Sequence, residues 1–185
     1  MPRRLETALD GLVLVEPDPH GDERGFLVET YRADVWRGLG IDVEEFVQDN
    51  HSRSAQGTLR GLHFQTRPGQ AKLVHCARGT VFDVAVDLRP GSRSFGRWEG
   101  HVLSDANHHQ LFVPAGFAHG FLVTSEEADV AYKLSSYYDP ETERGIAWDD
   151  PEVGVEWPLE GAEPQLSARD RSAPRLADLA ADLPR

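Results

Sequence analysis

The stretch Thr80-Val81-Phe82-Asp83-Val84-Ala85-Val86-Asp87-Leu88 decides the fold class of this chain. Every second residue from Phe82 to Leu88 is apolar, and Asp83 and Asp87 lie among the residues between them. Side chains that alternate with a period of two point to opposite faces of an extended chain. The stretch therefore predicts a β-strand with one uniformly apolar face. We expect Asp83, on the other face, to form a hydrogen bond inside a barrel.

Similar short runs continue on both sides of this stretch, from about residue 11 to residue 157. They are rich in Val, Phe, Leu and Tyr, and clusters of Gly, Pro, Asn and Asp separate them. About ten strands with so little helix favour an all-β fold, with a closed or jelly-roll barrel and a few short helices. The further strands are predicted at 12–16, 25–29, 46–51, 59–65, 72–77, 98–103, 110–113, 117–124 and 129–136, and short helices at 32–39 and 173–183.

The composition restricts the class of protein. A length of 185 residues favours one domain over 1–185, in which 171–185 form a C-terminal tail. The 31 acidic residues outnumber the 19 basic ones, and the net charge of −12 argues against nucleic-acid binding. The one cysteine, Cys76, permits no intrachain disulfide, which suits a reducing cytoplasm. We expect neither a signal peptide nor a membrane span, because no sufficiently long apolar run occurs.

The histidines raise the question of a metal site. The segment 114–119 has the form P-x-G-x-x-H, which resembles the second motif of the cupins, and the predicted strands agree with a cupin jelly roll. Metal-binding cupins also need an H-x-H pair and a carboxylate to complete the ligand shell. Here His63 is followed by Gln65 where the second histidine would stand. The sequence therefore predicts no metal and no cofactor.

Without a metal, the barrel can use acid and base chemistry, for which His63 is the natural candidate. A single histidine is more often a hydrogen-bonded structural residue than a base, so its neighbours decide. Several segments resemble, in sequence order, the dTDP-4-dehydrorhamnose 3,5-epimerase family, which are cupin-type enzymes of deoxysugar-nucleotide synthesis. The likeness covers roughly four fifths of the chain. The segments are DERGF at 22–26, GTLRGLHFQ at 57–65, QAKLV at 70–74, PAGFAHGF at 114–121, YKLSSYYDP at 132–140 and LSARD at 166–170.

The resemblance implies a reaction at two carbons of a 4-ketohexose. A proton leaves C3 or C5, an enolate forms with the C4 carbonyl, and a proton returns on the opposite face. By resemblance, His63 is the base, Asp170 is its carboxylate partner and Tyr132 is the proton donor. Tyr138 is implied to stack on the thymine. An exchange of roles between Tyr132 and Tyr138 stays open at this stage.

The resemblance also implies residues that bind the substrate. Lys72 is expected near the enolate oxygen, and His119 is expected to donate to the sugar or to its carbonyl oxygen. Arg24 and Arg60 are expected at the pyrophosphate, because their forked donors suit it. Strict alternation would put Arg60 and His63 on opposite faces, so Gly61 is predicted to mark a bulge or twist. The remaining expected binding residues are Glu29, Gln48, Asp49, Asn50, Glu143 and Arg169.

The resemblance further implies that the substrate is a dTDP-4-dehydro-6-deoxyhexose. It also implies a homodimer, in which the N-terminal strand region of one subunit reaches the neighbour's sheet or site. The leading function is conversion of dTDP-4-dehydro-6-deoxy-D-glucose to dTDP-4-dehydro-L-rhamnose. Epimerisation at C3 or C5 alone in another deoxysugar pathway is an alternative. A sugar-nucleotide-binding cupin without turnover is another, and a metal-dependent cupin is a third.

Overall fold

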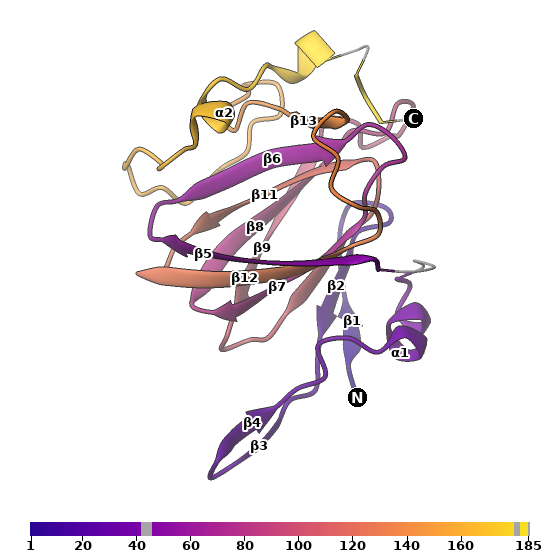
Figure 1. Ribbon diagram of the computed structural model, residues 1–185, viewed down its shortest axis with the longest axis vertical. Helices are drawn as coiled ribbons and strands as arrows, with labels where there is room; N and C mark the ends of the chain where they lie inside the picture. Colours follow the sequence, from indigo (N-terminus) through magenta and orange to yellow (C-terminus); the bar gives the residue numbers. More distant parts are fainter. Residues whose placement is uncertain (42–45, 180–181, 185) are drawn as a thin grey trace.

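The computed structural model describes residues 1–41, 46–179 and 182–184, which form a sandwich of two antiparallel sheets (Figure 1). In spatial order, the first sheet contains β1 (Arg3–Leu5), β2 (Val13–Glu16), β10 (Gln110–Val113), β7 (Lys72–Arg78), β12 (Glu127–Leu134) and β5 (Gln48–Ala55). The second contains β13 (Glu143–Gly145), β6 (Leu59–Gln65), β11 (Phe117–Val123), β8 (Thr80–Asp87) and β9 (Trp98–Ser104). A separate hairpin contains β3 (His20–Asp22) and β4 (Gly25–Leu27).

The eight strands from β5 to β12 have the topology of a jelly roll. Four of them form the order β10-β7-β12-β5 in one sheet, and the other four form β6-β11-β8-β9 in the facing sheet. The chain crosses between the sheets at several connections, so residues far apart in sequence line one interior. The predicted all-β fold is confirmed in this topology.

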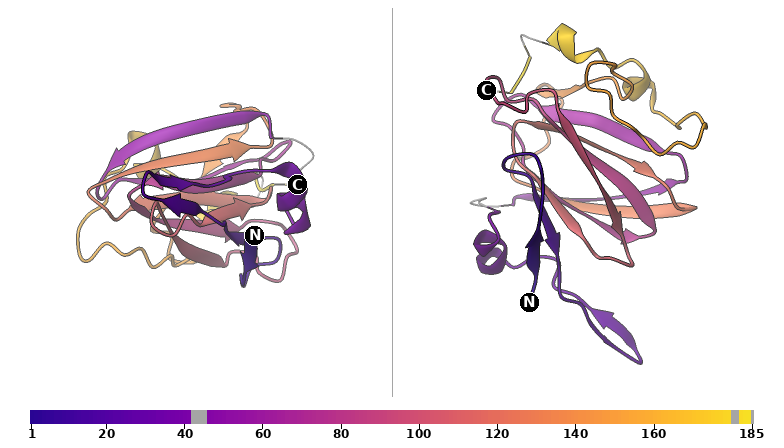
Figure 2. Two further views of the ribbon diagram at one scale, coloured as in Figure 1. Left: turned by 90° about the horizontal axis from the view of Figure 1, so that it is seen from below. Right: turned by 180° about the vertical axis from the view of Figure 1, so that it is seen from behind.

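Apolar side chains fill three layers. The interior cluster joins residues of both sheets, including Val74, Leu111 and Phe121. The short helix α1 (Ala33–Gly38) covers the outer face of the first sheet through Trp36. The C-terminal segment covers the outer face of the second sheet (Figure 2), with Leu176 among its packed residues. Both faces of the sheets are thus largely buried, which restricts the polar cavity to one end of the interior.

The two faces of strand β8, which lies between β11 and β9, have different surroundings. Its uniformly apolar face, with Val84 and Val86, packs under the C-terminal segment on the outside of the sandwich. The face that carries Asp83 points into the interior, where the carboxylate contacts His119. The expected hydrogen bond of Asp83 inside the barrel is therefore present. A polar group on the inner face of a central strand indicates that the interior holds more than a hydrophobic core.

Most predicted elements are present, with differences at their ends. The helix expected at 173–183 is a 3₁₀ helix over Leu176–Leu179, and positions 180–181 lie outside the described residues. The strand expected at 129–136 ends at Leu134, and the one at 25–29 ends at Leu27. Strands β1, β3 and β13 were not predicted, because three-residue strands carry too little periodicity to detect.

Candidate active site

A cavity of about 560 Å³ opens at one end of the sandwich, between the two sheets. It is lined mostly by polar side chains, from strands of both sheets and from the C-terminal segment. The lining residues are Gln48, Asn50 and Ser52 of β5, Arg60 and His63 of β6, Gln70, Lys72, His119 and Phe121, Tyr132 and Leu134 of β12, Tyr138, Glu143, Ser167, Arg169 and Asp170.

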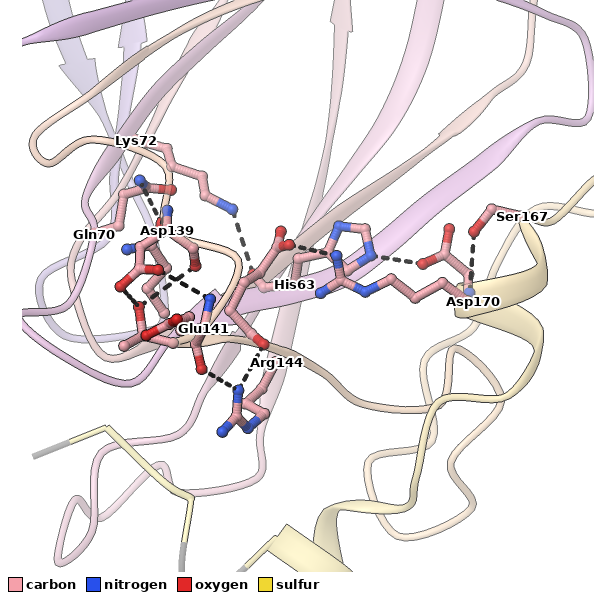
Figure 3. A network of polar contacts seen from close by, with 12 residues as sticks. His63, Gln70, Lys72, Asp139, Glu141, Arg144, Ser167 and Asp170 are labelled. Carbon is pink, nitrogen blue, oxygen red and sulfur yellow. Dashed lines mark hydrogen bonds and ion pairs between the residues drawn. The ribbon is translucent and has the colours of Figure 1, made fainter.

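The imidazole of His63 is paired with a buried carboxylate. His63 Nε2 lies 2.6 Å from Asp170 Oδ1 (Figure 3). Burial disfavours the charged carboxylate, but the contacts with His63 and Ser167 outweigh it and lower the pKa of Asp170 below its usual value. The ionised carboxylate therefore accepts the Nε2 hydrogen. His63 is held in one tautomer with Nδ1 free to take a proton.

The short helix α2 (Ala168–Arg171) places this carboxylate. Its N-cap is Ser167, whose hydroxyl accepts the backbone N–H of Asp170 at 3.0 Å. A serine at this position is a preferred N-cap because its oxygen pairs with an N–H group that the helix leaves free. The segment is tied to the sandwich by Gln165, which forms a bridge with Thr58 beside β6. These contacts bring Asp170 to His63.

A β-bulge in β6 lets two expected site residues share the cavity. Opposite β11, His119 pairs with His63 but Phe121 pairs with Arg60, so three residues of β6 span what two span on its neighbour. Gly61 has a φ of +127°, and a Cβ there would lie 2.5 Å from the Cα of Gly120. Only glycine fits that conformation and contact without strain. The irregularity predicted at Gly61 is therefore present, and both Arg60 and His63 line the cavity.

Lys72 is the cation of the cavity floor. Its side chain is only 9% exposed, and Nζ donates to the backbone carbonyl of His63 at 3.3 Å. Burial lowers the pKa of Lys72 to about 8, although Glu143 and Asp83 act in the opposite direction. A buried ammonium can stabilise negative charge on a bound molecule more strongly than a solvated one, because water screens it less.

A second histidine and carboxylate pair lies deeper in the interior. His119 Nε2 is 2.9 Å from Asp83 Oδ1 and 3.0 Å from Oδ2. Both side chains are buried, yet His119 also lines the cavity. Asp83 thus orients the ring of His119, a role for which the sequence offered only the polar position in an apolar strand.

The two tyrosines of the cavity have different surroundings. Tyr132 lies on β12, and its hydroxyl accepts a hydrogen bond from Asn50 at 3.2 Å. Tyr138 follows the end of that strand and is half exposed, beside the ion pair of Glu143 and Arg169. Glu143 raises the pKa of Tyr138 above its usual value, since a nearby negative charge disfavours the phenolate. Tyr132 is the tyrosine held within the strand framework of the cavity.

Three expected binding residues do not line this cavity. Arg24 lies on the projecting hairpin and pairs with Asp22, and Glu29 follows the hairpin and pairs with Arg32 at 3.5 Å. Asp49 stands between two cavity residues of β5, so its side chain points to the opposite face and contacts Lys133 at 2.9 Å.

Five lining residues were not expected. The alternation of β5 would have found Ser52, two positions after Asn50. The other four lie inside segments that carry the family resemblance, but apolar, amide and hydroxyl side chains in strands and loops are most often structural, so none was singled out. The unexpected residues are Ser52, Gln70, Phe121, Leu134 and Ser167.

The arrangement brings a base, a phenol and a cation to one cavity. His63 lies on β6 of one sheet, whereas Tyr132 lies on β12 of the facing sheet. Groups on facing sheets can reach opposite sides of a flat ring placed between them. The geometry can therefore remove a proton from one face and return one to the other, while Lys72 stabilises negative charge.

Comparison with known proteins identifies the family of this chain. A sequence model of dTDP-4-dehydrorhamnose 3,5-epimerase matches residues 6–178. The chain belongs to this family. The dTDP-4-dehydrorhamnose 3,5-epimerase of Pseudomonas aeruginosa is 51% identical over 171 residues, which cover 92% of this chain and 94% of that protein. The protein is therefore an isomerase, as the motifs of the sequence predicted.

Solved structures of epimerases agree with this assignment. A dTDP-6-deoxy-D-glucose-3,5-epimerase from Legionella pneumophila, in complex with dTDP-4-keto-L-rhamnose, is 48% identical. It has a TM-score of 0.96, over 100% of this chain and 98% of that one. A 3′-monoepimerase from Streptomyces bikiniensis, in complex with dTDP-quinovose, is 36% identical with a TM-score of 0.90, over 96% and 91% of the two chains. The predicted cupin-type jelly roll of the epimerase family is confirmed.

Proposed function

We propose that this protein inverts C3 and C5 of dTDP-4-dehydro-6-deoxy-D-glucose to give dTDP-4-dehydro-L-rhamnose, without a metal or another cofactor. The observation that carries the proposal is the His63 and Asp170 pair at 2.6 Å, in one cavity with Tyr132 on the facing sheet. The Legionella pneumophila epimerase in complex with dTDP-4-keto-L-rhamnose supports a substrate of this class.

The proposed reaction proceeds through one enolate at each carbon. His63 Nδ1 takes the C3 proton, and the electron pair of that C–H bond forms the C3–C4 double bond of the enolate. The ammonium of Lys72 stabilises the negative C4 oxygen. Tyr132 then protonates C3 on the opposite face. After proton exchange with water restores both groups, the same steps occur at C5.

The nucleotide is proposed to lie toward the open side of the cavity. Arg60 and Arg169 offer forked donors for the pyrophosphate, and Tyr138 offers a half-exposed ring for the thymine. Together with Glu143, Gln48 and Asn50, these residues would enclose dTDP.

The assembly is proposed to be a homodimer that completes this nucleotide site. Arg24 and Glu29, both expected at the nucleotide, lie at or beside the hairpin of β3 and β4, which extends away from the sandwich (Figure 1). The hairpin also exposes Phe26 at 61% and Leu27 at 73%. Exposed large apolar side chains on a projecting arm are typical of a surface that another chain covers. We propose that the arm of one protomer reaches the cavity of its partner in the cytoplasm.

A second candidate is inversion at a single carbon. The likeness to the 3′-monoepimerase favours it, because that protein shares the fold at 36% identity. Single and double inversion use the same base and acid, so they differ in whether the ring can reposition for the second proton transfer.

Proton NMR in deuterated water distinguishes these functions. The purified, metal-stripped protein is incubated with dTDP-4-dehydro-6-deoxy-D-glucose, and a reductase traps the inverted product. Deuterium at C3 and C5 with inversion at both is expected. Deuterium at one carbon alone would establish the single-site epimerase. Saturable nucleotide binding with deuterium at neither carbon would overturn the catalytic proposal in favour of a binding protein. Activity that needs added metal would overturn the proposed cofactor independence.

A further inference from the structure

A directed chain of hydrogen bonds links the segment of Tyr138 to the phenol of Tyr132. The backbone N–H of Tyr138 donates to Gln48 Oε1 at 2.9 Å, and Gln48 Nε2 donates to Asn50 Oδ1 at 3.0 Å. Asn50 Nδ2 then donates to Tyr132 Oη at 3.2 Å. Asn50 of β5 and Tyr132 of β12 are register partners, so their side chains lie on the same face of the sheet.

The backbone N–H of Tyr138 sets the direction of every hydrogen bond in this series. A backbone N–H can only donate, so the oxygen of the Gln48 amide must face Tyr138. Its NH₂ group consequently faces Asn50, whose oxygen accepts it, and the NH₂ group of Asn50 faces Tyr132. The phenol oxygen therefore accepts, and its single hydrogen remains free for the cavity.

We propose that Gln48 and Asn50 are positioning residues that keep the hydroxyl of Tyr132 oriented as a proton donor toward the sugar. This inference rests on the proposed function, in which Tyr132 is the acid. It also separates the two tyrosines: Tyr132 receives the directed hydrogen bond, whereas Tyr138 contributes its backbone N–H and starts the chain. The segment proposed to bind thymine is thereby coupled to the proton donor.

The sharpest test reverses the direction of these hydrogen bonds by a substitution at Gln48, the residue farther from Tyr132. In Gln48→Glu, both side-chain oxygens accept, so Asn50 must turn its NH₂ group toward position 48. The Asn50 oxygen then faces Tyr132 and takes the phenol hydrogen away from the sugar. In Gln48→Met, the link is lost without reversal, and Asn50 can keep its orientation. The two substitutions are similar in size, so a packing role of Gln48 would make their effects alike.

The measurement is the ratio of inversion to deuterium uptake at saturating dTDP-4-dehydro-6-deoxy-D-glucose. Enolates formed without a working acid are protonated again by His63, so deuterium enters with retention. Inversion by Gln48→Glu is expected to fall roughly 100-fold, the size of a general-acid contribution, while deuterium uptake changes only a few-fold. Gln48→Met, which breaks the hydrogen bond to Asn50 without reversing it, is expected to lose inversion far less than Gln48→Glu. Asn50→Asp, which also offers only acceptors to Tyr132, should match Gln48→Glu and replaces it if that variant does not fold.

The matched control is His51→Gln, on the same strand but with its side chain directed out of the cavity toward Asp129. It should leave the ratio unchanged. Equal losses in Gln48→Glu and Gln48→Met, or no change of the ratio in Gln48→Glu and Asn50→Asp, would overturn the positioning role while wild-type activity upholds the proposed function. A wild-type protein without inversion or deuterium uptake would instead overturn the proposed function, and the positioning role with it.

Discussion

His63 obtains its chemical setting from a carboxylate 107 positions away in the sequence. The contact uses Nε2, which directs Nδ1 to the substrate under the proposed mechanism, and it keeps a positive charge stable once the proton has been taken. A histidine of the same strand without Asp170 would be a less well oriented base. At this scale, the role of a residue depends on which of its atoms are already engaged.

The base and the acid should be separable by substitution. His63→Ala is expected to abolish deuterium uptake at C3 and C5, because it removes the proposed base. Tyr132→Phe is expected to reduce inversion roughly 100-fold while sparing deuterium uptake more, since the base still forms the enolate. Both rates are measured by NMR in deuterated water. Equal and mild losses in both variants would contradict the assigned roles.

Lys72 should give the activity an alkaline limit. With its pKa lowered to about 8 by burial, the ammonium loses its proton as the pH rises through about 8. We expect kcat/KM to fall above that pH, and Lys72→Met to be slower and to lack this limit. A wild-type profile that stays flat to pH 10 would argue against a charged Lys72 in the reaction.

The lowered pKa of Lys72 should also affect how the stability of the fold depends on pH. Burial lowers the pKa in the folded protein, whereas the unfolded chain keeps the usual value of 10.5. Between about pH 8 and 10.5 the unfolded state therefore binds more protons, and the free energy of unfolding should rise with pH. Urea denaturation of wild type and Lys72→Met measures this contribution. From about pH 8 to 10.5, the free energy of unfolding of the wild type should rise relative to that of Lys72→Met.

Among the elements, the four-residue helix α2 has an influence beyond its size, because it carries Asp170. Its N-cap, Ser167, holds the backbone N–H of that same residue. Helices this short have little stability of their own, so the cap and the surrounding contacts determine where the carboxylate lies. The orientation of the His63 ring therefore depends on a short helix within the C-terminal segment as well as on strand β6.

Removal of this cap should affect stability and catalysis together. Ser167→Ala is expected to lower the free energy of unfolding by about 1 kcal/mol. It is also expected to lower kcat, because Asp170 is less well held against His63. Ser167→Thr should restore both, since threonine is also an N-cap residue. Ser172→Ala, which removes a hydroxyl from the other end of α2, serves as the control. If Ser167→Ala changed KM alone, the cap would not position the base.

For the molecule as a whole, the hairpin of β3 and β4 stands out because it belongs to neither sheet of the sandwich. Within the described chain the ring of Phe26 packs against His108, yet Phe26 and Leu27 stay 61% and 73% exposed. The hairpin's charged residues were expected at the nucleotide, yet they lie outside the cavity of their own chain. The proposed dimer would account for both observations.

Phe26→Asp should therefore weaken the assembly. Sedimentation velocity is expected to show a dimer for wild type and a shift toward monomer for the variant, with a rise in KM for the nucleotide sugar. Val102→Asp places the same charge at another exposed apolar position, on β9, and should leave the assembly intact. A monomeric wild type, or a dimeric Phe26→Asp with unchanged KM, would exclude the proposed role of the arm.

The sequence by itself determined most of the strands and most of the side chains that can take part in chemistry. Strands β6 and β10 have the predicted bounds, because alternation and turn residues are local signals. His63, Lys72, Tyr132 and Asp170 were found through motifs that the family shares, and all four line the cavity. The bulge at Gly61 was also predictable, since two expected site residues stood three positions apart on one strand.

Only the tertiary structure decided which of these groups meet. It placed Asp49 on the far side of β5 and Arg24 on the hairpin, away from the cavity of their own chain. It also brought Gln48 and Asn50 into one directed chain with Tyr132. The reason is that local patterns report backbone geometry over a few residues, whereas contacts between sheets and with the C-terminal segment depend on how distant strands pack.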